Sequence, residues 1–337
     1  MDYTLLNDFS QIQAQEWNDL LSESISDTPF LRYEYQQAWW QHRGGGEWKN
    51  AQLILVTARE NGKLIGIAPL FIAEYENQPA LLLNGSIEIS DYLDLIVRKE
   101  DHTNFLTGLL DFLASSLADN WSKLDWYNLP DDSPTLAALK AEGEKRGWAH
   151  LEEVYRPTPR IALNGNFEDY LANIDKKQRH EIRRKMRRAA ESELNVRFVI
   201  VDQSADIEPE LRAFFDLMVQ DSNKATFLHP AMREQMTAFL RAAHAGGYLW
   251  LGFLEIAGEK TAASLNFDYN GKLWGYNSGV SRSNMELSPG WVLMAHTIQW
   301  CCENGRYEFD FMRGDEDYKY RLGGVNRFVM RARLNRK

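Results

Sequence analysis

The chain has 337 residues, of which 44% are hydrophobic and 12% aromatic, and its formal net charge at pH 7 is −10. This length exceeds what one hydrophobic core usually occupies, so we expect two domains. The acidic balance argues against a general nucleic-acid-binding protein, because neutralising phosphates requires a positive field over much of the surface. The first residues lack the basic and apolar regions of a signal peptide, and no apolar run is long enough to span a membrane, so the sequence predicts a cytoplasmic protein.

The first half of the chain predicts a mixed α/β arrangement. Alternating residues indicate strands at 52–59 and 63–72, joined by a hairpin turn at Asn61 and Gly62. Further strands are expected at 80–83, 92–97 and 124–128. The apolar spacing of 103–117 predicts a helix between the last two. We therefore expect antiparallel hairpins followed by a helical crossover into a parallel neighbour.

The second half repeats this order of elements. Strands are predicted at 248–256, 261–269 and 272–278, followed by a helix at 289–304 and a strand at 307–311. The same order twice in one chain indicates a duplication. We place the boundary near residues 155–160, where two prolines restrict the backbone, which gives domains 1–157 and 158–337.

The start of the helix at 289–304 has the features of an anion-binding site. Ser288 can cap the helix, Pro289 suits its first turn, and Gly290 leaves the backbone open to close approach. A helix start offers unpaired N–H groups to a phosphate. We therefore predict that Ser288, Pro289, Gly290 and Trp291 bind a phosphate-bearing ligand.

A dense group of charged residues follows the strand at 307–311. This group contains Asp310, Arg313, Asp315, Glu316, Asp317, Lys319 and Arg321. A simple connection does not require so many charges, so we interpret the segment as part of a site.

Together, the Ser288-Pro-Gly segment and the charged segment resemble the CelD-like acetyltransferases of bacterial polysaccharide gene clusters. That family is a branch of the GNAT superfamily related to the Fem-type peptidoglycan-bridge transferases. The resemblance covers roughly residues 160 to 330 and includes a basic helix upstream of both motifs. It implies a GNAT-like fold, here as two tandem domains, with acetyl-CoA or another acyl-CoA as donor and no metal. The expected acceptor is an amine or hydroxyl on a sugar or cell-envelope polysaccharide precursor.

Acyl transfer needs a group that removes a proton from the attacking amine or hydroxyl. The carboxylates predicted for this role are Asp310, Asp315 and Glu316. The cations predicted to hold the substrate are Arg313, Lys319 and Arg321. Asp310 has a second interpretation, an ion pair that fixes Arg313 or Lys319.

The segment 176–188 predicts an amphipathic basic helix with Asp175 near its start. Four interpretations stay open: a solvated face, contact with CoA phosphates, contact with an anionic acceptor, or contact with RNA phosphate. So much positive charge in an acidic protein favours an anion-binding role. Related transferases carry a similar helix beside the cleft, so we assign Arg179, Arg183 and Arg187 to substrate binding.

The first half has no counterpart of either motif, so we expect the donor site in the second half alone. The segment 90–94 offers Asp91 and Tyr92 as acceptor contacts, or is a turn that caps a strand. Two other functions stay open: an aminoacyl-tRNA-dependent Fem-type transferase and an inactive GNAT-fold binding module. The acidic balance, and the lack of the long helical-hairpin insertion that many Fem-type enzymes carry, argue against the first of these.

Overall fold

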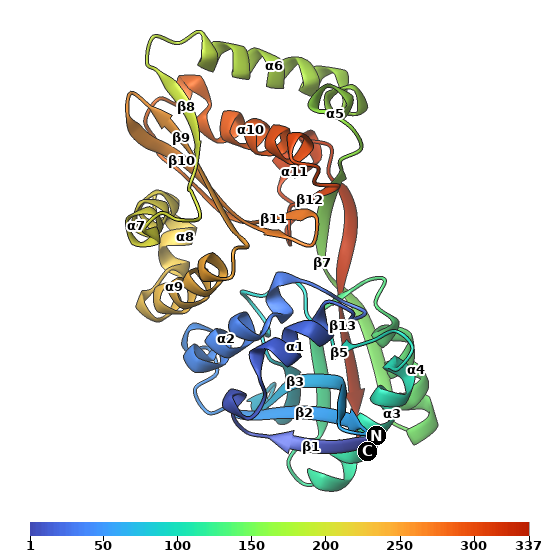
Figure 1. Cartoon of the computed structure of the whole chain (residues 1–337). Coiled ribbons are helices and arrows are strands. Elements are labelled where there is room, and N and C mark those ends of the chain that lie inside the picture. The colour runs from blue at the N-terminus through green and yellow to red at the C-terminus, as the bar shows by residue number, and fades with distance from the viewer. Residues whose placement is uncertain (337) are drawn as a thin grey trace. The chain divides into compact units, whose positions relative to one another are not determined.

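The structure is a computed structural model that describes residues 1–336, and the chain forms two compact units (Figure 1). The first unit comprises Met1–Pro157 together with the segment that begins at Phe328, and the second comprises Thr158–Arg327. The boundary falls inside strand β7 (Ala149–Ala162), so Pro157 and Pro159 lie in an extended strand. The last residues, which we had expected in the second domain, belong to the first unit because strand β13 (Val325–Asn335) pairs there.

The sheet of the first unit has the strand order β1-β2-β3-β4-β6-β13. Its strands are β1 (Asp2–Leu6), β2 (Gln52–Glu60), β3 (Lys63–Tyr75), β4 (Gln78–Leu83) and β6 (Lys123–Pro130), with the short β5 (Ile96–Val97) beside β3. The strands pair antiparallel except β4 and β6, which are parallel. The predicted hairpin and crossover are confirmed. The strand expected at 92–97 is much shorter, because the Asp94 side chain bonds to Ser133, Thr135 and the Leu95 N–H.

Four α-helices cover this sheet. They are α1 (Ala14–Leu21), α2 (Tyr33–Gly46), α3 (His102–Ser116) and α4 (Pro134–Arg146), and two short 3-10 turns lie at Phe9–Gln11 and Pro29–Leu31. Helix α3 is the predicted crossover between β4 and β6. Most of its apolar face is buried, with Phe105 and Leu109 at 0% exposure.

The sheet of the second unit has the strand order β7-β12-β11-β10-β9-β8. Its strands, after β7, are β8 (Val196–Ile200), β9 (Leu249–Ile256), β10 (Glu259–Tyr269), β11 (Lys272–Val280) and β12 (Glu308–Asp310). Strand β12 is parallel to β11 and antiparallel to β7, and the other pairs are antiparallel. The predicted strands of this half are therefore confirmed, although the last is shorter than expected.

Helices lie on both faces of the second sheet (Figure 1). They are α5 (Phe167–Asn173), α6 (Lys176–Ala190), α7 (Ile207–Met218), α8 (Ser222–Phe227), α9 (Pro230–Ala245), α10 (Pro289–Glu303) and α11 (Asp317–Arg321), with a 3-10 turn η3 at Met285–Leu287. Helix α10 packs on β9, β10 and β11 and is covered by α6, while α7 contacts β10 and β11. A Cβ atom at Gly279 would lie 2.5 Å from the backbone of Leu217, so α7 can approach β11 only at a glycine.

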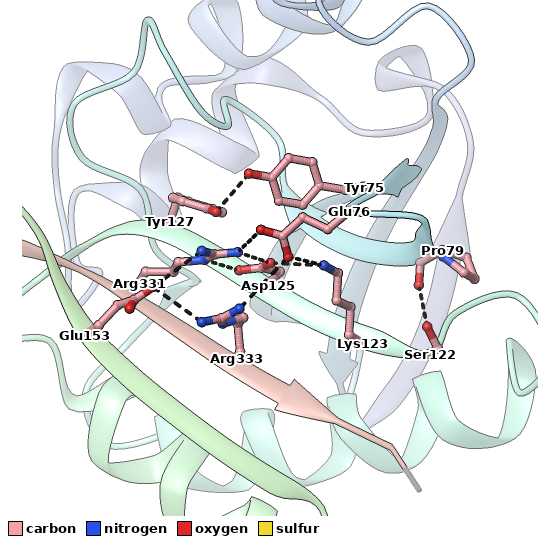
Figure 2. A network of polar contacts seen from close by, with 10 residues as sticks. All are labelled: Tyr75, Glu76, Pro79, Ser122, Lys123, Asp125, Tyr127, Glu153, Arg331 and Arg333. Atoms are coloured by element: carbon pink, nitrogen blue, oxygen red, sulfur yellow. Dashed lines mark hydrogen bonds and ion pairs between the residues drawn. The ribbon is translucent and has the colours of Figure 1, made fainter.

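A network of ion pairs holds strand β13 in the first unit (Figure 2). The Arg331 guanidinium forms two hydrogen bonds to Asp125, from Nε to Oδ1 at 2.8 Å and from Nη2 to Oδ2 at 2.7 Å. It also reaches Glu76 at 3.1 Å and Glu153 at 3.3 Å. The Asp125 side chain is completely buried. A buried carboxylate needs a paired charge, so Arg331 fixes the position of the C-terminal strand.

Removing Arg331 is expected to be costly. The variant Arg331→Ala leaves the buried Asp125 with only Lys123, 3.6 Å away, and should destabilise the first unit by about 3 kcal/mol or more. The matched control is Arg333→Ala, because Arg333 makes longer ion pairs of 3.4 and 3.9 Å to half-exposed carboxylates. We expect it to cost about 1 kcal/mol or less. Urea unfolding followed by tryptophan fluorescence measures both, and equal losses would contradict the assignment.

Candidate functional site

The candidate site lies where β11 continues beyond the end of β12. Strand β12 pairs with β11 from Lys272 opposite Glu308 to Trp274 opposite Asp310, whereas β11 runs on to Val280. The same strand contains a bulge, because Gly275 and Asn277 face consecutive residues of β10 and Tyr276 is the extra residue. Bulges bend a strand and are common beside active sites. The sheet therefore opens along the second half of β11.

A cavity of about 500 Å³ occupies this opening. Its walls come from β10 and β11, from the start of α10, from α6, and from α11 with the residue that follows it. The residues that line it are Lys185, Ala263, Ser264, Ser278, Val280, Met285, Ser288, Pro289, Gly290, Trp291, Leu293, Met294, Tyr318 and Leu322. Mostly apolar walls with a few polar groups are typical of a ligand-binding pocket. All four residues predicted to bind a phosphate-bearing ligand, 288–291, lie on this wall.

The start of α10 differs from the expected cap. Ser288 has left-handed backbone angles, φ 54° and ψ 55°, and its side chain makes no capping hydrogen bond. The N–H groups of Trp291 and Val292 both donate to the Ser288 carbonyl, at 3.0 and 3.1 Å. Pro289 has no N–H. The N–H of Gly290 is therefore the one donor of this first turn that has no acceptor among the described residues. The helix start offers an anion fewer donors than the sequence suggested.

Gly290 is also needed for packing. A Cβ atom at this position would lie 3.1 Å from Cγ2 of Val280 on β11, which is closer than an ordinary contact. The glycine therefore brings the helix start against the open part of β11. This contact places the free N–H of Gly290 at the wall of the cavity.

Lys185 supplies positive charge at the same point, and our sequence analysis did not select it. Its Nζ donates to Ser288 Oγ at 3.2 Å, lies 3.5 Å from Glu181, and sits 5.1 Å from the centre of the Trp291 ring. An ammonium group at a helix N-terminus is unfavourable, because the helix dipole is positive there. A bound anion would make the position of the ammonium group favourable, because the anion would lie between two positive charges. Lys185 and the N–H of Gly290 together therefore favour a phosphate. The only signal for Lys185 in the sequence was its membership of the basic segment.

The arginines predicted to bind substrate have different surroundings. Arg179 donates to the carbonyls of Leu171 and Ala172 at 3.3 and 3.2 Å, and Arg183 pairs with Glu168. These contacts fasten α5 to α6, and neither arginine lines the cavity. Arg187 lies on another part of the helix, beside a second hollow.

The charged segment after β12 is organised around Lys319. Its Nζ donates to the carbonyls of Met312, Arg313 and Gly314, at 3.3, 2.8 and 3.3 Å, and lies 2.9 Å from Glu316. Its side chain is 2% exposed. The ammonium donors are thus used inside the segment, so the structure gives Lys319 an internal role in place of the predicted substrate contact. Arg321 forms an exposed ion pair with Asp317.

Asp310 is fully buried at the end of β12. Its Oδ1 accepts the N–H of Met312 at 2.7 Å, and its Oδ2 lies 3.1 Å from Nε of Arg160, its partner in the β7 register. An ion pair of the kind that we considered as an alternative therefore exists, with Arg160 as a partner of Asp310. None of Asp310, Asp315 and Glu316 is among the residues that line the cavity, and Asp310 is buried whereas Asp315 and Glu316 are exposed.

Two further polar groups border the opening. Lys224 on α8 donates from Nζ to the Ser278 carbonyl at 2.6 Å and lies 3.3 Å from Ser278 Oγ. Burial lowers the pKa of Lys224, and the nearby carboxylates of Asp221 and Glu316 oppose the shift. Burial, with a smaller contribution from Glu316, raises the pKa of Tyr318 above its ordinary value. Neither residue was selected from the sequence.

Comparison with known families identifies this unit. Residues 176–320 match the family model described as an acetyltransferase (GNAT) domain. The chain contains a GNAT acetyltransferase domain. No curated protein matches the sequence.

Solved structures share the fold of this chain over nearly its whole length. FemX aligns with a TM-score of 0.70 at 12% identity, covering 98% of this chain and 97% of that chain. L-PGS from Bacillus licheniformis gives 0.58 at 11%, covering 95% and 91%. A tandem GNAT protein from the clavulanic acid biosynthesis pathway gives 0.51 at 12%, covering 99% and 98%. The predicted fold class, tandem GNAT-like domains with a mixed sheet, is confirmed.

The acceptor contacts predicted in the first unit are largely buried there. Tyr92 is 1% exposed, with its ring 6.5 Å from that of Phe30, and Asp91 is 8% exposed. Tyr92 is therefore a core residue with almost no surface for a ligand, and the hydrophobic contact explains its position.

Within residues 1–336, no group of three or more His, Cys, Asp or Glu side chains is placed to hold a metal ion. No helix in this part of the chain has the length and apolar character needed to span a membrane.

We expect the internal role of Lys319 to appear in stability. The variant Lys319→Met leaves three carbonyls without their donor and should destabilise the GNAT domain by about 2 kcal/mol or more. The control Arg321→Met breaks the exposed pair with Asp317 and should cost about 0.5 kcal/mol or less. Thermal unfolding together with limited proteolysis at residues 312–316 measures both effects. A Lys319→Met protein with wild-type stability and protease resistance would refute the internal role.

Proposed function

We propose that the GNAT domain transfers an acyl group from acyl-CoA to an amine or hydroxyl, on a sugar or cell-envelope polysaccharide precursor. The observation that carries the proposal is the apolar cavity of about 500 Å³ that ends at the Gly290 N–H and the Lys185 ammonium. A ligand that fits it has an uncharged arm and a phosphate group at one end. Acyl-CoA, with a thioester arm and a diphosphate, has this chemistry. The proposal keeps the cytoplasmic location predicted from the sequence.

The proposed donor orientation follows from the walls of the cavity. The thioester arm lies along the open part of β11, near Ser278 and Val280, where β12 supplies no partner strand. The diphosphate lies at the start of α10, where Lys185 neutralises part of its charge. Trp291, whose ring centre lies 5.1 Å from the Lys185 Nζ, closes this end of the cavity.

The reaction joins the acceptor to the thioester carbonyl carbon and breaks the carbon–sulfur bond. The acceptor proton must leave, and the departing thiolate must gain a hydrogen bond or a proton. Tyr318 is the neutral hydroxyl proposed to donate to the sulfur, because it lines the cavity. Glu316 is our first choice as general base, since it is exposed and oriented by Lys319, and Asp315 is the second. We assign Asp310 a positioning role because it is buried against Arg160.

A thermal-shift comparison tests the donor class. A ligand that binds only the native state raises the unfolding midpoint, so acetyl-CoA or a longer acyl-CoA should stabilise the protein in a concentration-dependent way. Charged tRNA is the competing donor of a Fem-type transferase. It is favoured by the basic helix α6, on which Lys176 and Lys177 have no ion pair within residues 1–336. A shift with tRNA and none with any acyl-CoA would support that alternative, and no shift at all would favour a binding module.

Substitution of Gly290 should weaken donor binding. The variant Gly290→Val fills the space beside the free N–H, and we expect its affinity for acetyl-CoA to fall about tenfold or more, which equals 1.4 kcal/mol. The side chain would also press on Val280, so the double variant Gly290→Val/Val280→Ala serves as the control. Calorimetric titration should find the weak binding unchanged in the double variant. Recovery of wild-type affinity would mean that Gly290 matters only for packing.

The carboxylates should separate into one that acts in turnover and one that supports the fold. We expect Glu316→Gln to lower kcat by about 10²-fold with the melting temperature nearly unchanged. Asp310→Asn should lower the melting temperature, because Arg160 loses its buried partner, while turnover of the folded fraction stays close to normal. Thiol release from acetyl-CoA with a panel of amino sugars measures turnover. A well-folded Asp310→Asn protein without turnover would return the role of base to Asp310, and Asp315→Asn tests the remaining carboxylate.

A further inference from the structure

A second hollow lies beside the donor cavity, between the last turns of α6 and the turn η3. It is open and has a volume of about 590 Å³. The residues that line it are Arg184, Arg187, Arg188, Glu191, Ser192 and Leu287. We call it the arginine groove. It is part of the second unit and shares two segments with the cavity, because Leu287 precedes Ser288 and Arg184 precedes Lys185.

The three arginines of the groove differ in what they already bind. Arg184 forms a two-bond pair with Glu181 at 2.9 and 2.8 Å, and Arg188 donates to the Glu286 carbonyl at 2.7 Å. The Arg187 guanidinium is exposed and makes no ion pair or hydrogen bond with any of residues 1–336. One complete arginine fork is therefore available in a groove whose frame is fixed by the other two.

The positions of the lining residues on α6 place the arginine groove next to the cavity. Residues 184, 187, 188 and 191 follow one another at intervals of three, one and three, so they form one ridge of the helix. Lys185 and Arg188 both contact the segment 286–288, through Ser288 Oγ and the Glu286 carbonyl. A residue three positions further along a helix lies about 4.5 Å further along its axis. A ligand that leaves the cavity past Lys185 therefore meets Arg188 next, and Arg187 lines the same groove beside Arg188.

We infer that the arginine groove binds the terminal phosphate monoester of the donor, the 3′-phosphate of CoA, with Arg187 as its main contact. This inference rests on the proposed acyl-CoA function and extends it to a recognition element. A phosphate monoester carries close to two negative charges and presents oxygens that match the planar arginine fork. The uncharged arm, the diphosphate and the monoester of one molecule would then lie in order at the cavity, at Lys185 and at Arg187.

Dephospho-CoA, which lacks only the 3′-phosphate, is the direct probe. Calorimetric titration of the wild-type full chain should give an affinity for CoA about tenfold or more above that for dephospho-CoA, the scale of one charge-assisted hydrogen-bonded pair. Arg187→Gln should remove most of this difference by weakening CoA alone. The matched control is Lys177→Gln, an unpaired cation at the other end of α6, which should change neither affinity.

The possible outcomes separate the groove from the donor proposal. Equal wild-type affinities for CoA and dephospho-CoA, or an Arg187→Gln variant that loses both equally, would overturn the inference and leave the acyl-CoA function standing. Absence of binding by either nucleotide would overturn both. If only tRNA bound, and Arg187→Gln weakened it, the groove would belong to an RNA-binding surface and the inference would be wrong. Because Arg187 is exposed and unpaired, its variant should melt like the wild type, which a thermal scan verifies.

Discussion

The end of β12 at Asp310 is the constraint on which the functional site depends. The buried carboxylate is bound to Arg160 on β7 and to the N–H of Met312, so it fixes the chain where it leaves the sheet. Met312 then adopts φ 59°, a left-handed conformation that turns the chain away from β11. Had β12 continued, its backbone would have paired with β11 as far as Val280. The opening of the sheet is therefore created by one ion pair and one backbone turn.

The charged residues of the second unit fall into two groups. The charges of the first group are balanced by partners in the protein, and the cations of the second group are left in excess. Lys319 pairs with Glu316 and Arg183 pairs with Glu168, and these contacts shape the segments that carry them. Lys185 shares Glu181 with Arg184 and is placed against a helix dipole of the same sign, and Arg187 has no partner within residues 1–336. A protein with a net charge of −10 that keeps such cations in one region favours an anionic ligand there.

Elements set by local sequence were predictable. Hairpin turns such as Asn61-Gly62 and the start of α10 at Pro289 depend on residues a few positions apart, and the structure contains them. Contacts between distant residues were not predictable: Lys185 meets Ser288 across 103 positions, and Arg331 meets Asp125 across 206. A sequence also does not reveal whether neighbouring charges face a ligand or one another. For this reason Lys319 was assigned to substrate although its donors are used internally.

The first unit shows how the same arrangement can exist without an opening. There the parallel pair is β4 and β6, joined through α3 as β11 and β12 are joined through α10. After β4 ends at Leu83, the chain stays beside β6, because Asn128 donates to the carbonyls of Ile87 and Ser90 and accepts the N–H of Leu93. Leu93 is completely buried, as are Asn84 and Ser86. In the first unit, the protein's own chain occupies the place beside the sheet. In the second unit, the corresponding place is open to a ligand. This difference gives a physical reason to expect the donor in the second unit alone.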